Sequence, residues 1–233
     1  MLESPDMVSP NENGRQVYLA SNSPRRRELL SLTRIEFTLL PAHVDETPLP
    51  NEDGLEYVKR IAHNKAVASS DQPGVNGVII AADTAVVNGF GKGGAKILGK
   101  PPDPEAAVAM LRSLRGHTHQ VYTAIFILLT QGGTRLSDLC TTDVPMRDYT
   151  DSEIEAYVTG GDPMDKAGAY AIQHPGFHPV NHLQGCYANV MGLPLCHLVR
   201  NLWRLGIVPS VDVPQACQSA LKYDCPVYDL ILN

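Results

Sequence analysis

The chain has 233 residues, 43% of them hydrophobic and 19% charged, a composition typical of a folded globular protein rather than a disordered or fibrous one. Its 19 basic and 25 acidic side chains give a net charge of −6, which argues against broad nucleic-acid binding through phosphate neutralisation. The five cysteines include no CxxC pair, so neither a disulfide framework nor a zinc ribbon is indicated, and reduced thiols in a cytoplasmic protein fit best.

The amino-terminal third predicts a flexible arm followed by alternating strands and helices. Residues 1–14 carry acidic and turn-forming side chains and lack the basic start and apolar run of a signal peptide. No apolar stretch in the chain approaches the roughly 18 residues needed to span a bilayer, so we expect no membrane insertion. We expect a short strand at 15–20, and a helix at 23–32 with Ser23 as its N-cap before Pro24.

The middle of the chain predicts a second helix at 53–69 and a buried strand, VIIAAD, at 78–83. Glycines at 89–94 then indicate a hairpin. A helix at 103–114 is indicated by Asp103 as N-cap and by a proline at the first helical position. These elements alternate in the manner of an α/β protein.

The second half predicts a long antiparallel pair from 121 to about 147, and then a helix that Thr150 and Glu153 open as a capping box. The segment rich in Gly, Pro and His at 159–192 favours a functional loop region, and an apolar-faced helix follows at 194–205. We therefore expect one α/β domain, in two lobes around a cleft, and an irregular or weakly structured C-terminal extension at 207–233.

The segment LASNSPRRRELL carries the first candidate binding site. A strand leads through a serine-rich turn into a helix start, where free backbone N–H groups and the positive end of the helix dipole favour an anion. Arg25 and Arg26 add guanidinium groups suited to phosphate oxygens. Taken alone, the same string also fits a capped surface helix with solvated arginines.

Candidate acidic groups follow the strands. Asp83 ends the apolar run VIIAAD, where it could hold Mg²⁺, activate a water molecule, or simply cap the next turn. Asp45 and Glu46 could supply a second carboxylate or lie in a solvated loop. Lys65 lies seven residues after Val58, on the buried side of the predicted helix, so its ammonium group needs a charged partner or a cleft.

Further along, Lys100 in ILGKPP either meets a phosphate or caps a loop, and Gln173 offers the amide donor and acceptor that can read a base edge. His117 and His119 could share one face of a strand, but no third zinc ligand is evident. Neither a Walker A loop nor a GxSxG motif is present.

Seven motifs occur together in the order and approximate spacing of one known family: LASNSPRRRELL, VDE, AHNKA, AADT, ILGKP, PMDKAGAYAIQ and GCYANVMGLPL. Over about residues 15–205 the chain resembles the Maf family of nucleotide pyrophosphatases. The resemblance implies a mixed, twisted sheet flanked by helices, similar to inosine triphosphatases, with the Maf-like domain at 15–206.

The resemblance also implies an activity: hydrolysis of a nucleoside triphosphate to the monophosphate and pyrophosphate by a homodimer that uses Mg²⁺ or Mn²⁺. Thr84 and Gln173 match members that act on dTTP and UTP, whereas His174 and Pro175 stand where a glycine usually follows, so a modified pyrimidine nucleotide remains open. The implied catalytic residues are Asp83, Glu46, Lys65 and Lys100, the first two also binding metal; the implied substrate-binding residues are Ser23, Arg25, Arg26, Thr84 and Gln173.

Two other functions fit the same residues. One is a nucleotide-binding regulator of cell division or septum formation whose hydrolysis is slow or incidental. The other is a metal-dependent phosphatase that releases inorganic phosphate. Turnover assays with several triphosphates, and identification of the products, separate both from a pyrophosphatase.

Overall fold

The computed structural model describes residues 14–89 and 95–233. The predicted arm therefore lies outside the described residues apart from Gly14, and so does the tip of the predicted glycine hairpin, 90–94. The flanks of that hairpin are described, and they pair as expected, with Val86 opposite Leu98.

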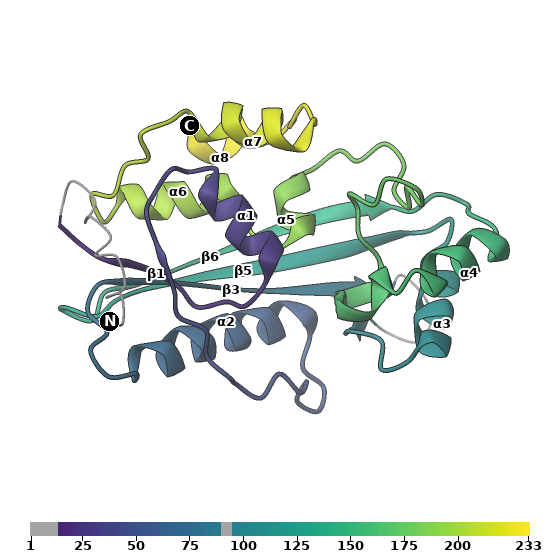
Figure 1. The fold of residues 1–233 in the computed structure, drawn as a ribbon, viewed down its shortest axis with the longest axis horizontal. Helices are drawn as coiled ribbons and strands as arrows, with labels where there is room; N and C mark the ends of the chain where they lie inside the picture. The colour runs from purple at the N-terminus through teal and green to yellow at the C-terminus, as the bar shows by residue number, and fades with distance from the viewer. Residues whose placement is uncertain (1–13, 90–94) are drawn as a thin grey trace, which may run out of the picture.

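A six-stranded mixed sheet forms the centre of the molecule (Figure 1). Its order is β2-β1-β3-β5-β6, with β4 also paired to β3. Strand β1 runs parallel to β2 and β3, whereas β3 is antiparallel to β4 and β5, and β5 to β6. The strands are β1 Val17–Leu19, β2 Thr38–Leu39, β3 Val78–Asn88, β4 Lys96–Leu98, β5 Thr118–Leu129 and β6 Arg135–Pro145. The predicted mixed α/β sheet flanked by helices is thus confirmed.

The helices begin where the sequence places their caps. Ser23, Asp53, Asp103 and Thr150 each accept a hydrogen bond from a first-turn amide, and Thr150 forms the predicted capping box with Glu153. The helices are α1 Pro24–Ser31, α2 Gly54–Ser70, α3 Pro104–Leu114, α4 Asp151–Thr159, α5 Tyr187–Met191, α6 Leu195–Trp203, α7 Val213–Leu221 and α8 Tyr228–Leu232, with 3₁₀ turns at Asp162–Asp165 and Ala167–Ala169.

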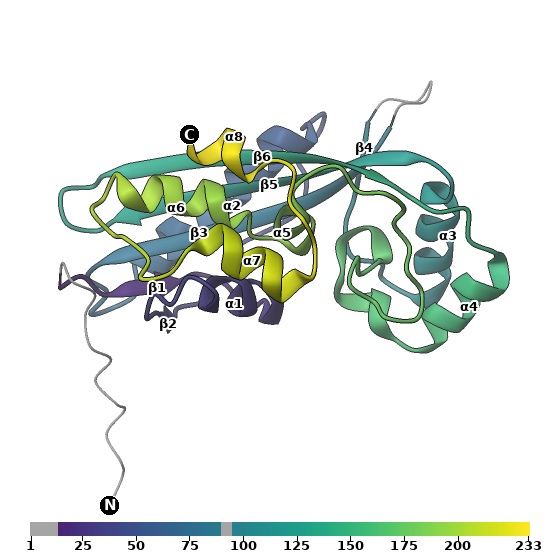
Figure 2. The ribbon, with the colours of Figure 1, turned by 90° about the horizontal axis from the view of Figure 1, so that it is seen from above.

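Alternation along β3 decides which helices cover which face of the sheet. Ile79, Ala81 and Ala85 face α2, and the even-numbered residues Val78 and Ile80 pack with α1, α5 and α6 on the other face. Further along that second face a separate core cluster joins the sheet to α3 and α4. Figure 2 shows two helical groups along the long strands: α1, α5, α6 and α7 lie toward one end, and α3 and α4 lie at the other. This arrangement agrees with the expected two lobes.

Strand β3 is longer than predicted, and this changes the position of Asp83. The strand continues to Asn88, because β5 supplies antiparallel partners as far as Val87. Asp83 is therefore a mid-strand residue, and the expectation that it ends the strand is wrong. On its other edge, β3 pairs with β1 up to Ile80 and with β4 from Val86, so Asp83 lies just beyond the carboxyl end of the short β1.

The C-terminal segment is more ordered than predicted. Asp212 caps α7, and Pro214 occupies its first turn, a position where proline needs no amide hydrogen. Ile207 and Val213 are buried in the same core as α6, and Figure 1 shows α7 and α8 lying beside that helix. The expectation of an irregular or weakly structured extension is therefore wrong, whereas the domain boundary near 206 stays a prediction.

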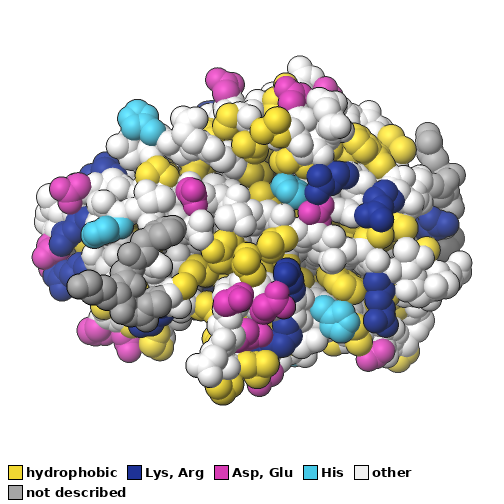
Figure 3. All heavy atoms as spheres, turned by 180° about the vertical axis from the view of Figure 1, so that it is seen from behind, with side chains coloured by type: hydrophobic (Ala, Val, Ile, Leu, Met, Phe, Trp, Pro, Cys, Tyr) yellow, Lys and Arg dark blue, Asp and Glu magenta, His cyan; other side chains and the backbone are white. Residues whose placement is uncertain are grey.

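Charges of both signs lie close together on the face shown in Figure 3, with hydrophobic side chains between them. That face therefore presents no extended field of one sign, in keeping with the small net charge. Within residues 14–89 and 95–233, the helices are too short or too polar for any of them to cross a membrane.

Candidate active site

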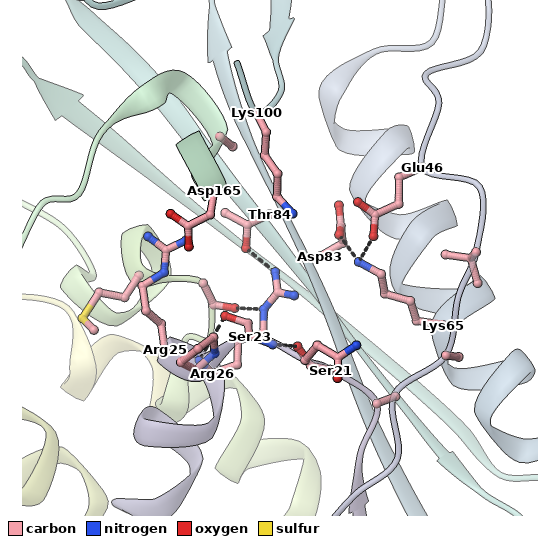
Figure 4. A pocket seen from close by; sticks show the side chains of 18 of the residues that line it. Ser21, Ser23, Arg25, Arg26, Glu46, Lys65, Asp83, Thr84, Lys100 and Asp165 are labelled. Carbon is pink, nitrogen blue, oxygen red and sulfur yellow. Dashed lines mark hydrogen bonds and ion pairs between the residues drawn. The ribbon is translucent and has the colours of Figure 1, made fainter. Parts of the chain in front are cut away.

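A cavity of about 450 Å³ opens between the two helical groups, a size suited to a nucleotide-sized ligand. Charged side chains reach it from α1, from the segment before α2, from α2 itself, from β3 and from the loops after β4 and α4 (Figure 4). They are Arg25, Arg26, Glu46, Lys65, Asp83, Lys100 and Asp165. Segments far apart in the sequence thus converge on one charged cavity.

The start of α1 forms one wall, as predicted. Ser23 is the N-cap, and its Oγ accepts the amide hydrogen of Arg26 at 3.4 Å. Pro24 has no amide hydrogen and the amide of Arg26 is bonded to Ser23, so few free N–H groups remain for an anion at this helix start. The positive charge at this wall therefore comes mainly from the guanidinium groups of Arg25 and Arg26.

Arg26 is held in a fixed orientation. Its Nε donates to the carbonyl of Gly192 at 2.8 Å, and its Nη2 donates to Thr84 Oγ1 at 3.0 Å. Burial lowers the pKa of Arg26, and the negative charges of Asp83 and Glu46 oppose that effect. A half-buried, doubly anchored guanidinium loses little further entropy when it binds a phosphate.

Gly192 is required where it stands. It ends α5 with φ +114°, a conformation that side-chain-bearing residues rarely adopt. An added Cβ would lie 3.3 Å from Thr84 Oγ1 and 3.4 Å from Arg26 Nε. The glycine thus brings the backbone carbonyl of α5 close to the arginine.

Thr84 belongs to a chain of hydrogen bonds that runs inward from Arg26. Its hydroxyl lies 2.9 Å from that of Thr123, which donates to the carbonyl of Asn189 at 3.0 Å. Because Thr84 accepts from Arg26 and Thr123 already donates its proton to Asn189, Thr84 must donate to Thr123. Thr84 therefore lines the cavity with a hydroxyl group already committed to orienting Arg26.

Lys65 bridges the two predicted acidic residues. Its Nζ lies 2.6 Å from Glu46 Oε1 and 2.7 Å from Asp83 Oδ1, which confirms the expectation that this lysine needs a charged partner. Burial raises the pKa of Asp83 against the opposing charges of Lys65 and Arg26. Burial also pushes the pKa of Glu46 upward, but its hydrogen bond to Lys65 and the charges of Lys65 and Lys100 hold that pKa below its ordinary value.

The far side of the cavity carries Lys100 and Asp165, as Figure 4 shows. Lys100 is exposed, so its ammonium group is accessible to an incoming anion. Asp165 was not among the expected residues, although it lies in the motif PMDKAGAYAIQ. It pairs with Lys166 at 2.6 Å, and in Figure 4 the side chain of Arg25 points toward it.

Gln173 is not among the residues that line this cavity, and its side chain is exposed in the loop before α5. A contact between Gln173 and a base therefore stays a prediction. Asp45 is exposed and accepts the amide hydrogen of Thr47, as the solvated-loop alternative expects. His119 is buried against Tyr170, with 2.8 Å between its Nε2 and the tyrosine hydroxyl.

The donor set of the cavity fits Mg²⁺ or Mn²⁺. Asp83 Oδ1 and Glu46 Oε1 both contact Lys65 Nζ, which leaves the second oxygen of each carboxylate as the candidate metal ligand. Mg²⁺ is commonly bound by one or two carboxylates together with substrate phosphate oxygens and water. Over the described part of the chain, no group of three or more His, Cys, Asp or Glu side chains is arranged to hold a metal without substrate. A cation here would therefore depend on oxygen ligands from the substrate.

The fold and the cavity together define an α/β protein with a charged cavity of nucleotide size, lined by four cationic side chains and three carboxylates. The chain belongs to the Maf family, whose model, described as Maf-like protein, matches residues 16–205.

Relatives named dTTP/UTP pyrophosphatase are similar over most of the chain. The protein of Nitrosomonas europaea is 43% identical over 213 residues, covering 86% of this chain and 99% of its own. The protein of Geobacter sulfurreducens is 41% identical over 195 residues, covering 84% and 98%. A solved structure of the Staphylococcus aureus Ham1 protein aligns with a TM-score of 0.43 and 16% identity over 71% of this chain and 80% of that one.

Proposed function

We propose that this protein hydrolyses a pyrimidine nucleoside triphosphate, dTTP, UTP or a modified form, to the monophosphate and pyrophosphate. The observation that carries the proposal is the convergence of Arg26, Lys65 and Lys100 with Asp83 and Glu46 in one cavity. Membership of the Maf family and the names of the relatives support the reaction class and the choice of base. Thr84 and Gln173 support the same base through the family resemblance.

In the proposed reaction the triphosphate lies across the start of α1. Arg25, Arg26 and Lys100 bind the phosphate oxygens and neutralise the charge that accumulates on the departing pyrophosphate. Asp83 accepts a proton from the attacking water, whose oxygen bonds to the α-phosphorus as the bond to the bridging oxygen breaks. A raised pKa makes this carboxylate a stronger base than an ordinary aspartate.

Lys65 and Glu46 keep that carboxylate in place. Lys65 holds Asp83 and Glu46 within hydrogen-bond distance of one ammonium group, which favours the orientation of both carboxylates toward the cavity. A divalent cation held by Asp83 and Glu46 supplies charge neutralisation at the phosphates when it is bound. As further parts of the proposal, the family resemblance supports a homodimer that uses Mg²⁺ or Mn²⁺. The cysteine pattern supports a cytoplasmic protein, and the net charge and the lack of a long apolar stretch support the expectation of no nucleic-acid or membrane partner.

Replacing Asp83 by Asn tests the proposal, with Asp45→Asn as the matched control. Both substitutions remove one carboxylate, but Asp45 is exposed and does not line the cavity. We expect Asp83→Asn to lower pyrophosphate release from dTTP and UTP by at least about a hundredfold, as the loss of a general base usually does. Asp45→Asn should retain wild-type rates, and both proteins should keep a cooperative thermal transition.

The products and the rates decide among the alternatives. Equal activity of Asp83→Asn and wild type would remove this aspartate from the mechanism. Release of inorganic phosphate in place of pyrophosphate would support the phosphatase, and tight nucleotide binding without turnover by the wild type would support the regulator of cell division. Screening common and modified pyrimidine triphosphates identifies the base.

A further inference from the structure

The segment after residue 205 lies beyond the part of the chain that matches the family, yet it packs on the elements that form the active site. Ile207 and Val213 are buried in the same core cluster as Ala188 and Met191 of α5. Cys217, on α7, packs against that cluster as well. The extension thus shares its core with α5 and α6, and Figure 1 shows α7 lying near both helices.

Tyr223 makes the most directed contact between the extension and the rest of the protein. It follows α7, and its hydroxyl lies 3.0 Å from the carbonyl oxygen of Leu183 and 2.9 Å from that of Gly185, so the two carbonyls share its one hydrogen as acceptors. Its ring lies 5.4 Å from the ring of Tyr187, the first residue of α5. One side chain thereby fixes the backbone that leads into α5.

Helix α5 needs such support, because its five residues form little more than one turn and cannot be stable without tertiary contacts. From the sheet side, Asn189 donates from Nδ2 to the carbonyl of Val121 at 3.0 Å and to Thr142 Oγ1 at 2.9 Å. From the opposite direction, Tyr223 holds the entry to the helix. The position of α5 is therefore set jointly by the sheet and the extension.

Both anchored nitrogens of Arg26 depend on α5. Nε donates directly to the carbonyl of Gly192, at the end of the helix. Nη2 reaches the carbonyl of Asn189 through the hydroxyl groups of Thr84 and Thr123. A displacement of α5 would therefore disturb both anchors of the guanidinium at once.

We propose that Tyr223 is a positioning residue for the nucleotide site, acting through α5 to hold Arg26 in the orientation that binds phosphate. The inference rests on the proposed function for the identity of the substrate. It assigns to the C-terminal extension a role in substrate affinity and turnover, in addition to its burial of apolar surface. The chain of contacts runs from Tyr223 to α5, and from α5 to Arg26 by two routes.

Tyr223→Phe is the direct test, because it keeps the ring and removes only the hydroxyl that donates to the two backbone carbonyls. Tyr228→Phe is the matched control: Tyr228 is a second tyrosine of the extension, and its hydroxyl interacts with Asp229 on its own helix. We expect Tyr223→Phe to lower kcat/KM for dTTP by about threefold to tenfold, the range expected for a lost hydrogen bond. Tyr228→Phe should leave kcat/KM unchanged.

A double-mutant cycle with Arg26→Ala separates positioning from general destabilisation. Arg26→Ala alone should lower kcat/KM at least tenfold, since charge-assisted bonds to phosphate are lost. If Tyr223 acts through Arg26, adding Tyr223→Phe to Arg26→Ala causes no further loss. An equal fold-loss in both backgrounds, or wild-type kinetics for Tyr223→Phe, would overturn the proposal.

Calorimetry of inorganic tripolyphosphate binding tests the positioning role without any hydrolysis. It is measured in the four proteins of the cycle: the wild type, Tyr223→Phe, Arg26→Ala and the double variant. Tyr223→Phe should weaken tripolyphosphate binding in the wild-type background and leave it unchanged in the Arg26→Ala background. If the wild type hydrolyses no triphosphate while this pattern holds, the proposed function fails and the positioning role stands. If hydrolysis is normal but the affinities show no coupling, the positioning role fails alone.

Discussion

Replacing His119 by Phe should make the protein less sensitive to acid. His119 lies on β5 with no measurable exposure, and its Nε2 contacts the hydroxyl of Tyr170 at 2.8 Å. Burial lowers the pKa of His119 from 6.5 to about 4, because the imidazolium would lose its hydration. The folded protein therefore keeps this side chain neutral at pH values where the unfolded chain binds a proton.

The sign and the size of the effect follow from that difference in pKa. Above pH 6.5 His119 is neutral in both states and adds no pH dependence. As the pH falls from 6.5 toward 4, the unfolded state gains a proton and the folded state does not, so stability is lost. At about 1.4 kcal/mol for each unit between the two pKa values, the full loss is about 3.5 kcal/mol, of which about 2.5 kcal/mol is reached by pH 4.5.

Urea unfolding of wild type and His119→Phe at pH 7.5 and 4.5 measures this contribution. At pH 7.5 the variant should be less stable by about 1–3 kcal/mol, because the buried hydroxyl of Tyr170 loses its partner. At pH 4.5 the difference in unfolding free energy between the variant and the wild type should have shifted by about 2.5 kcal/mol in favour of the variant. His117→Gln removes an exposed histidine near the start of the same strand and should keep the wild-type acid loss. A difference in unfolding free energy between variant and wild type that is the same at both pH values would refute the reasoning.

Two further substitutions test the packing of the site. Lys65→Met should cost about 3–5 kcal/mol in urea unfolding, because Asp83 is only 5% exposed and loses its ion-pair partner. Lys59→Met removes a solvent-exposed ion pair and should cost less than about 1 kcal/mol. Equal losses of unfolding free energy in Lys59→Met and Lys65→Met would contradict the burial argument. Gly192→Ala should lower both stability, by about 1–3 kcal/mol, and kcat/KM, since its Cβ would press on Arg26. Gly74→Ala, also at positive φ but in open space, should lower stability alone; unchanged kinetics in Gly192→Ala would separate that glycine from Arg26.

Local signals predicted most of the fold. The predicted capping residues Ser23, Asp103 and Thr150 mark helix starts within one residue, because a cap depends on only a few neighbouring amides. The length of β3 was not predicted, because its continuation past Asp83 depends on a partner strand some forty residues away. The ordered extension was missed because its prolines read as breakers, although Pro214 lies where a helix tolerates it.

The candidate site was predicted in its charges but not in its connections. Helical spacing alone placed Lys65 on the buried side of α2, and the structure supplies its two carboxylate partners. Nothing local indicates that Thr84 and Gly192 share Arg26, since these contacts join residues more than fifty positions apart. The role of Asp165 was missed for a similar reason, because only the fold brings its loop to the cavity.

The interrupted edge of β3 has a consequence for solubility. Between its pairing with β1 and its pairing with β4, the strand has a short stretch, 81–85, along which neither strand is in register with it. Open strand edges usually invite pairing with other molecules and hence aggregation. Here the stretch lies at the wall of a charged hollow, where an incoming strand would meet the buried charges of Lys65 and Asp83. The charges of this cavity should therefore keep neighbouring chains from adding to the sheet.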